Sequence, residues 1–353
     1  MSFFEYDWQE RLVDDYSDFV KCRTLAVVKE NRKGLVDGVR SSFLSTLSRV
    51  SQIDNRSDGI PEYQVKGFEI IGDQSTHDES DPVFVLIGGV HGLERIGSQV
   101  VLSYIESLFN RMGWDDELIS SFNKVKFLSI PILNPVGIHS LTRSNGNGVD
   151  LMRNAPVDSD EASIFPIAGH RTSPRLPYYR GKLGAPMEAE SQALVDFVFE
   201  HIKKSRFVIA LDVHSGFGAR DRLWYPHAKT TKAFEKTKEA LHLMSAFEGA
   251  FKNHVYLIEP QSKSYTTHGD LWDYLYELYS KENPTGLFLP WTLEMGSWMW
   301  IRKNPRQLFN ASGIFDPILP HRKKRILRRH MPLLDFFLKA GANHSKIFRR
   351  NAS

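Results

Sequence analysis

The sequence has one cysteine, little net charge and no long apolar run. Because Cys22 is the only cysteine among 353 residues, no internal disulfide can form, which is typical of proteins in reducing compartments. No window approaches the roughly 18 consecutive apolar residues of a membrane span. With 45 Lys and Arg against 42 Asp and Glu, the net charge is +3, so no global field favours nucleic acid as a partner.

Several other signals are also missing. The N-terminus carries acidic residues at Glu5, Asp7 and Glu10 and has no basic segment followed by an apolar one, so no secretory signal is predicted. We therefore expect a soluble cytoplasmic protein. The sequence contains neither the G-x-S-x-G elbow of serine hydrolases nor the H-E-x-x-H pair of one class of metalloprotease. Nothing in the sequence indicates an oligomeric state.

Short apolar runs alternate with amphipathic stretches after residue 62. Several runs are rich in Val, Ile and Phe and apolar throughout, which is typical of strands buried on both faces; they cover residues 67–71, 83–87, 125–132, 207–213, 254–258 and 287–293. Amphipathic stretches such as 97–109 and 187–202 predict helices between them. This alternation predicts one three-layer α/β domain, with a mixed, mostly parallel twisted sheet and helices on both faces.

Two further segments flank the predicted main domain at 63–320. Residues 1–62 predict a helical N-terminal extension, because apolar residues recur at steps of three and four. Residues 321–353 predict a basic C-terminal helix or tail that starts with the basic cluster 321–330. We interpret this cluster as the solvated face of a helix, with an anionic partner or membrane surface as the alternative.

Polar side chains follow the predicted strands at the points where they end. In open α/β sheets, ligands bind beyond the carboxyl ends of the strands. Four strand ends bring together the residues His91, Glu94, Asn134, Arg143, Arg153, His214 and Glu294. This convergence predicts a functional site at one edge of the sheet.

His91, Glu94 and His214 are candidate zinc ligands. The H-x-x-E pair alone also occurs by chance on surface turns, but His214 at the end of a second strand completes a His₂Glu set. Such a set with an open fourth position is typical of catalytic zinc. Glu294 is then a candidate general base for a water activated by the metal.

Arg143 and Arg153 flank the flexible stretch 144–150. A guanidinium binds a carboxylate or polarises a carbonyl through its forked donors. Each arginine alone is equally compatible with an ordinary surface loop.

The ordered combination of motifs resembles the carboxypeptidase A-like zinc carboxypeptidases, of the M14 type, over roughly residues 65–300. The motifs are His91-x-x-Glu94, Asn134-Pro135-x-Gly137, Arg143, Gly148-Val149-Asp150-Leu151-x-Arg153-Asn154, His214-Ser215, Tyr265 and Glu294. The resemblance implies one Zn²⁺ per chain, held by His91, Glu94 and His214. It also implies a zinc-bound water activated by Glu294.

The resemblance implies roles for further residues. Arg143 polarises the scissile carbonyl and stabilises the oxyanion, and Arg153 binds the substrate's C-terminal carboxylate. Asp150 orients the first zinc-binding histidine, and Tyr265 is a mobile substrate-binding tyrosine. These roles predict a zinc-dependent metallocarboxypeptidase that acts on a peptide or an amino-acid conjugate.

Two positions depart from the family pattern or restrict the substrate. Met152 occupies the place of an asparagine beside Arg153, and methionine cannot replace an amide donor to a carboxylate. Trp272 is expected to fill the side-chain pocket and to disfavour a charged or very bulky terminal residue. The Met152 departure keeps a second hypothesis open, a zinc amidase or deacylase acting on a non-peptide N-acyl substrate. A third is an inactive binding protein on the same fold, which the retained ligands and Glu294 disfavour.

Overall fold

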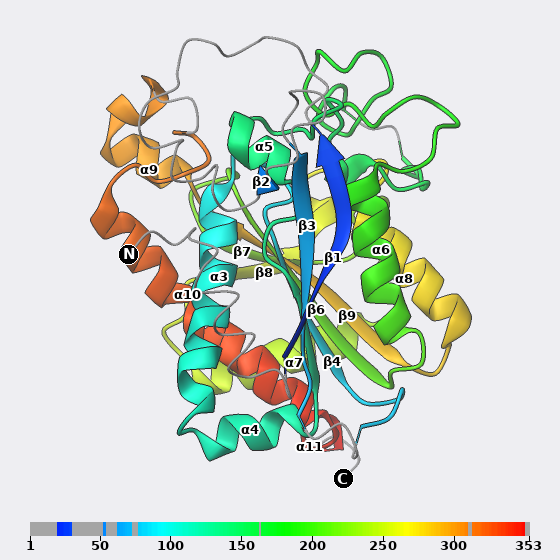
Figure 1. The fold of residues 1–353 in the computed structure, drawn as a ribbon, viewed down its shortest axis with the longest axis vertical. Helices are drawn as coiled ribbons and strands as arrows, with labels where there is room; N and C mark the ends of the chain where they lie inside the picture. The colour runs from blue at the N-terminus through cyan, green and yellow to red at the C-terminus, as the bar shows by residue number, and fades with distance from the viewer. Residues whose placement is uncertain are drawn as a thin grey trace.

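The computed structural model describes residues 20–29, 52–53, 62–72, 77–161, 164–309 and 313–349. These residues form one sheet with helices on both faces, and long connections gather above one edge of the sheet (Figure 1). None of the described helices is long and apolar enough to cross a membrane.

The sheet is mixed, with a parallel block at its centre. Its strands are β1 (Val20–Lys29), β2 (Gln52–Ile53), β3 (Glu62–Ile70), β4 (Val83–Gly88), β5 (Lys126–Ile130), β6 (Phe207–Ser215), β7 (Arg222–Tyr225), β8 (Leu257–Pro260) and β9 (Leu287–Met295). Their order is β1-β3-β5-β4-β6-β9-β7-β8, and β2 pairs with β3. The central strands β5, β4, β6 and β9 are parallel, whereas antiparallel pairs join β1 to β3, β3 to β5 and β7 to β9.

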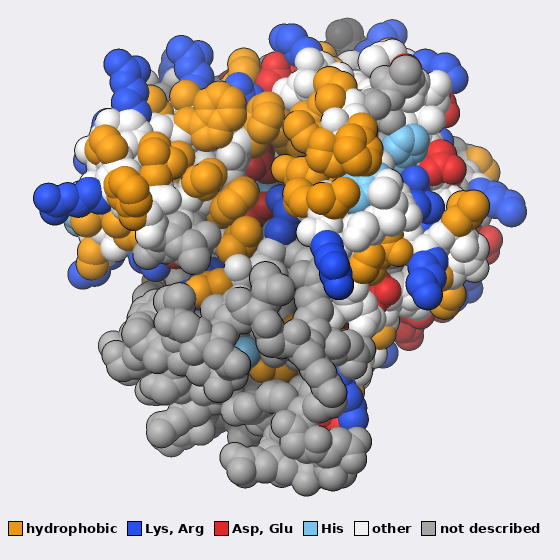
Figure 2. Space-filling model, turned by 90° about the horizontal axis from the view of Figure 1, so that it is seen from above, with side chains coloured by type: hydrophobic (Ala, Val, Ile, Leu, Met, Phe, Trp, Pro, Cys, Tyr) orange, Lys and Arg blue, Asp and Glu red, His pale blue; other side chains and the backbone are white. Residues whose placement is uncertain are grey.

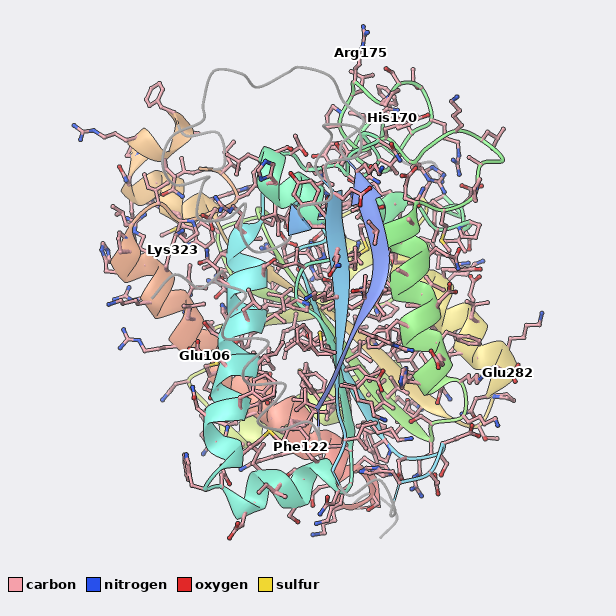
Figure 3. The ribbon with its side chains drawn as sticks, viewed as in Figure 1. Glu106, Phe122, His170, Arg175, Glu282 and Lys323 are labelled. Carbon is pink, nitrogen blue, oxygen red and sulfur yellow. The ribbon has the colours of Figure 1, made fainter. Side chains whose placement is uncertain are left out.

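Helices cover both faces of this sheet, which confirms the predicted three-layer fold. They are α3 (Arg95–Met112), α4 (Asp116–Phe122), α5 (Pro135–Ser140), α6 (Ala189–Ile202), α7 (Thr237–Ala250), α8 (Leu271–Glu282), α9 (Trp298–Lys303), α10 (Pro320–Ala342) and α11 (His344–Arg349). Helices α3 and α10 lie on one face, and α6 and α8 on the other (Figure 1). Glu106 on α3 and Glu282 on α8 accordingly lie on opposite sides of the molecule (Figure 3).

The core determines where the central strands end. Strands β4 and β6 are buried along their whole length, as their continuous apolar runs predict. Phe84 of β4 packs edge-on against Phe127 of β5 and Phe337 of α10, with ring centroids 5.5 and 6.0 Å apart. Each such buried ring stabilises the fold by about 1.5–3 kcal/mol. The well-packed strands therefore present their carboxyl ends at one rigid edge.

The helical prediction for residues 1–62 is wrong where the structure describes them. Residues 20–29 form the strand β1, which pairs with β3 in an antiparallel register. Val and Thr favour extended backbone because of their branched Cβ atoms, and β1 buries Val20 and Val28 while leaving Val27 exposed. The apolar spacing that predicted a helix involves Leu12, Phe19, Leu35, Val39, Phe43 and Leu47, which lie on either side of β1, and the strand itself has no regular alternation. The other residues of this segment, apart from 52–53 and 62, lie outside the described residues.

The basic segment 321–330 belongs to a helix, as predicted, but the helix continues beyond it. Pro332 lies inside α10, although proline removes one helical hydrogen bond. Leu333, Leu334 and Phe337, which follow it, are buried in the main core. Burial of this apolar stripe holds the second half of α10 on the domain, so the helix is part of the core.

Candidate active site

A tight backbone contact positions the turn that carries His91. A Cβ atom at Gly92 would lie 1.9 Å from the carbonyl carbon of Gly137, so only glycine fits there. Asn134 accepts a hydrogen bond from the Gly137 N–H at 2.8 Å and donates one to the Val90 carbonyl at 3.3 Å. The Asn-Pro-x-Gly motif thus supports the turn at the end of β4.

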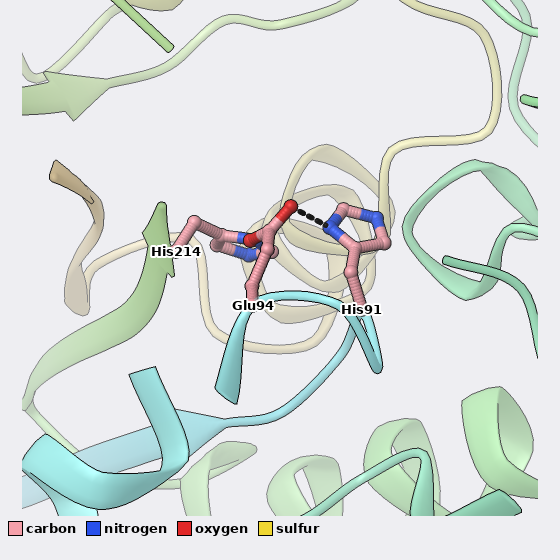
Figure 4. Close-up of side chains that lie close together, drawn as sticks. All are labelled: His91, Glu94 and His214. Atoms are coloured by element: carbon pink, nitrogen blue, oxygen red, sulfur yellow. Dashed lines mark hydrogen bonds and ion pairs between the residues drawn. The ribbon is translucent and has the colours of Figure 1, made fainter. Parts of the chain in front are cut away.

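The structure brings together the three residues that the sequence predicts as metal ligands (Figure 4). His91, Glu94 and His214 each offer a ligand atom within 4.8 Å of the other two. The Glu94 carboxylate lies between the imidazoles, with Oε1 2.8 Å from Nδ1 of His91 and Oε2 3.0 Å from Nδ1 of His214. All three side chains are buried.

Each imidazole has a second carboxylate behind it. Nε2 of His91 lies 3.1 Å from Oδ1 of Asp150, and Nε2 of His214 lies 3.0 Å from Oδ2 of Asp212. Nε2 of His91 also lies 2.9 Å from Nη2 of Arg143, which can only donate. Wherever an imidazole carries no proton on Nδ1, the lone pair of that atom is directed at Glu94. Lone pairs and a carboxylate that face one another in a buried space repel unless a cation lies between them.

This donor set fits zinc, which binds imidazole nitrogen and carboxylate oxygen. Burial alone would lower the pKa of His214, but Asp212 and Glu94 raise it well above its usual range. Burial alone would raise the pKa of Glu94, but His91 and His214 hold it well below its usual range. The cluster therefore attracts positive charge, whether protons or a metal ion.

Glu294 lies beside this cluster on the neighbouring strand. It pairs with His214 in the register of β6 and β9, and its Oε1 accepts a hydrogen bond from the Phe217 N–H at 3.0 Å. Burial and the charge of Glu94 raise the pKa of Glu294 to about 8. A cation at the cluster would lower this pKa, because positive charge favours the ionised carboxylate. With that cation bound, Glu294 is suited to accept a proton near neutral pH.

Asp150 joins Arg143, predicted as catalytic, and Arg153, predicted as substrate-binding, to the first histidine. Its Oδ2 accepts hydrogen bonds from Nε of Arg143 at 2.9 Å and from Nη1 of Arg153 at 3.0 Å. Burial alone would raise the pKa of Asp150, but Arg143, Arg153 and His91 hold it well below its usual range. This buried carboxylate therefore stays ionised and fixes all three side chains.

The two arginines face different parts of the site. Nη1 of Arg143 lies 3.2 Å from Oε1 of Glu94, so this guanidinium lies against the His91–Glu94–His214 cluster. Nε of Arg153 donates to the Ile167 carbonyl at 2.9 Å. No described residue accepts a hydrogen bond from Nη2 of Arg153, which leaves that nitrogen available to a ligand.

A cavity of about 430 Å³ opens over these groups. His91, Glu94, His214, Glu294, Arg143 and Arg153 all line it. Figure 2 shows hydrophobic side chains on both sides of a hollow in which acidic and basic side chains are visible. The cavity wall includes the partly exposed apolar residues Ile164, Ile167, Trp298 and Ile314. His170 and Arg175 lie in the long connection above the same edge of the sheet (Figure 3).

Two of the remaining predicted residues line this cavity and one does not. Met152 and Tyr265 belong to its lining, and the Tyr265 ring packs against Phe217 with centroids 5.7 Å apart. Trp272 is not among the described residues that line the cavity, so its predicted effect on the side-chain pocket stays a prediction. Its indole N–H instead donates to Oδ2 of Asp212 at 2.9 Å, since a buried donor needs an acceptor.

Three residues of the site were missed in the sequence. Asp212 precedes His214 by two residues in a strand, so both point to the same face; that spacing was the available signal. Tyr178 has a left-handed backbone, with φ of 69°, and its ring lies 4.9 and 4.8 Å from the guanidinium carbons of Arg143 and Arg153. Nothing in the sequence indicates that contact.

Asp270 is the third missed residue, a carboxylate in the cavity wall. It caps α8, with Oδ1 accepting from the backbone N–H groups of Trp272 and Asp273 at 2.9 Å each. Burial and the nearby Asp273 raise its pKa to about 7. The aspartate in the sequence Gly-Asp-Leu-Trp predicts a helix cap. That pattern does not predict that the same side chain lies in the cavity wall.

Comparison with known proteins gives one family and one fold. The family model described as zinc carboxypeptidase matches residues 5–283. Carboxypeptidase D from Homo sapiens is 26% identical over 123 residues, which are 32% of this chain and 9% of that protein. The match thus spans less than a tenth of that relative's length.

Two further similarities extend over more of the chain. The inactive metallocarboxypeptidase ECM14 of Saccharomyces cerevisiae is 24% identical over 185 residues, covering 50% of this chain and 42% of that protein. The crystal structure of carboxypeptidase A from Helicoverpa armigera superposes with a TM-score of 0.64 and 17% identity, covering 98% of this chain and 76% of that one. At this identity, the structural similarity establishes the fold alone.

Proposed function

The chain belongs to the zinc carboxypeptidase family, and from this premise we propose that it is an active zinc-dependent carboxypeptidase. Its substrate is a peptide or an amino-acid conjugate, hydrolysed at the C-terminal amide bond. The observation that carries the proposal is the single cavity in which the His91–Glu94–His214 cluster, Glu294 and two arginines meet.

His91, Glu94 and His214 would hold one zinc ion through two Nδ1 atoms and a carboxylate. A bound zinc ion supplies a Lewis acid, which polarises a carbonyl and lowers the pKa of a water to about 7. The remaining steps belong to side chains of the chain itself. Glu294 takes the proton of the attacking water and passes it to the leaving amine.

The two arginines divide the binding of the substrate. Arg143, held by Asp150 beside the cluster, donates to the carbonyl oxygen as negative charge develops there. Arg153 presents its free Nη2 to the terminal carboxylate, and its position is fixed by Asp150 and by the Ile167 carbonyl. Tyr265 lines the cavity together with the aromatic rings of Phe217 and Trp224, against which it packs. The apolar residues of the cavity wall favour substrates with apolar side chains next to the scissile bond.

Met152 supports a second candidate, a zinc amidase or deacylase. It lines the cavity beside Arg153 and offers no hydrogen-bond donor to a carboxylate. A substrate that lacks the terminal carboxylate would lose less binding here than at a clamp with two polar partners. The same metal and the same Glu294 would serve this reaction.

The experiment compares a peptide with its C-terminally amidated twin, after zinc has been quantified in the purified protein. We expect about one zinc per chain and release of the C-terminal residue from the free acid alone. Equal cleavage of both peptides would favour the amidase. Zinc without cleavage of either peptide would support an inactive binding protein.

Glu294→Gln separates metal binding from catalysis. It should retain zinc and lose roughly 10²–10⁴-fold in kcat, the usual contribution of a general base. Glu282→Gln on the exposed side of α8 is the matched control, because Glu282 lies far from the cavity (Figure 3). Wild-type activity of Glu294→Gln would contradict the assigned role.

The cytoplasmic location remains a prediction of the sequence, which fractionation of the host cell would test.

A further inference from the structure

The side chain of Trp272 lies beneath the metal cluster, outside the cavity. It is 4% exposed and belongs to the first turn of α8. The Asp270 carboxylate fixes its backbone by accepting the Trp272 N–H. Trp272 is not among the described residues that line the cavity.

The indole of Trp272 donates to a carboxylate that has little other support. Its Nε1 lies 2.9 Å from Oδ2 of Asp212, and Asp212 is fully buried. No other described residue donates a hydrogen bond to this carboxylate, and its Oδ1 has no hydrogen-bond partner. A buried carboxylate with one neutral donor costs free energy because its charge is poorly compensated, so a second source of stabilisation is expected.

His214 is that second source. Its Nε2 lies 3.0 Å from the same Oδ2 atom of Asp212, although the angle departs from that of a strong hydrogen bond. On the opposite side of the ring, Nδ1 faces Glu94 at 3.0 Å. The orientation of the imidazole is therefore determined between Asp212 and Glu94.

We propose that Trp272 and Asp212 form a positioning pair for the His214 ligand. The indole N–H holds the Asp212 carboxylate in place, and the carboxylate, 3.0 Å from Nε2, holds the His214 ring with its Nδ1 directed at the metal site. Carboxylates that orient zinc-bound histidines typically contribute 10- to 100-fold to metal affinity or activity. The inference rests on the proposed zinc site and extends its determinants to a tryptophan outside the cavity.

The test is the rate at which the zinc-loaded protein releases zinc to a chelator. Trp272→Phe removes the N–H and keeps a large aromatic ring. Trp291→Phe is the matched control, because Trp291 is also buried and its Nε1 has no hydrogen-bond partner in the described part of the chain. We expect zinc release roughly tenfold faster in Trp272→Phe and unchanged release in Trp291→Phe. Equal rates in the two variants would overturn the proposal.

A double-mutant cycle tests whether Trp272 acts through Asp212. Asp212→Asn should release zinc roughly 10- to 100-fold faster, and Trp272→Phe should add little in the Asp212→Asn background. Additive effects would show that Trp272 acts by another route and would overturn the pair. The thermal unfolding midpoint of each metal-free variant separates these effects from general destabilisation.

Cobalt substitution provides a second readout of the ligand geometry. The visible spectrum of the cobalt protein should change in Asp212→Asn and stay unchanged in Trp291→Phe. If Trp272→Phe does not fold, an unchanged spectrum and unchanged zinc release in Asp212→Asn overturn the proposal. A wild-type protein that binds no zinc overturns both the proposed function and this pair. One that binds zinc without cleaving peptides overturns the function alone.

Discussion

The two histidines proposed as metal ligands are each supported by a carboxylate, but these carboxylates lie in different surroundings. In the His91 arm, Asp150 holds His91 and also Arg143 and Arg153. In the His214 arm (His214, Asp212 and Trp272), Asp212 holds His214 and accepts a hydrogen bond from the neutral Trp272 indole. Asp150 therefore contacts two guanidinium groups, whereas no Lys or Arg in the described part of the chain contacts Asp212.

This difference separates two tasks of the site. Because Asp150 contacts both arginines, the His91 arm links metal binding to substrate binding. Among the described residues, the side chain of Asp212 has polar contacts with His214 and Trp272 alone, so we expect the His214 arm to act on metal binding. Substitutions in the two arms should therefore give different combinations of zinc loss and activity loss.

The largest effect is expected for Asp150→Asn. It should lower kcat/KM by roughly 100-fold or more, because the change loosens His91 and also leaves Arg143 and Arg153 without their shared anion. Excess zinc should restore the activity of Asp212→Asn but not that of Asp150→Asn. The measurement is kcat/KM at saturating zinc. Full recovery of both variants would remove the distinction between the arms.

The pH dependence of kcat/KM should report the protonation of Glu294, which pairs with His214 in the register of β6 and β9. Glu294 accepts a proton only when ionised, so kcat/KM should fall roughly tenfold per pH unit below its pKa. Without a metal, burial and Glu94 raise this pKa from 4.5 to about 8. Zinc should lower it, so the acid limb of kcat/KM is expected between these values.

The control for this profile lies on the other arm. Arg153→Lys should lower kcat/KM without moving the acid limb, because Arg153 is not among the charges that shift Glu294. An acid limb above pH 8, or one that moves with Arg153→Lys, would contradict the assignment of Glu294 as the base.

The smallest effect is expected at Tyr178, whose ring contacts both arginines. Tyr178→Ala removes contacts of about 0.5–2 kcal/mol and should raise KM roughly 2- to 30-fold, whereas Tyr178→Phe keeps the ring and should stay within about twofold. Zinc release should be unchanged in both, because Tyr178 contacts the arginines and no metal ligand. Faster zinc release in Tyr178→Ala would mean that the ring also supports the cluster.

Most of the central sheet was predictable because its strands leave a local signal. The runs at 83–87, 207–213 and 287–293 correspond to β4, β6 and β9, whose buried faces require continuous apolar sequence. The edge strand β1 and the short strand β7, which lies between β9 and β8, were missed. Strand β1 is largely exposed, so its apolar residues follow no single period, and β7 has only four residues, too few to show a period.

The sequence by itself determined the His91–Glu94–His214 cluster and the place of Glu294 beside it, because these residues follow strands that must end at the same edge. It did not determine what holds the cluster in place. Asp212 and Trp272 are 60 residues apart and meet because α8 packs against β9, which pairs with β6 in the sheet. Tyr178 reaches both arginines only through the path of a long loop. Side-chain partners of this kind are set by packing between distant segments, and no local pattern in the sequence encodes them.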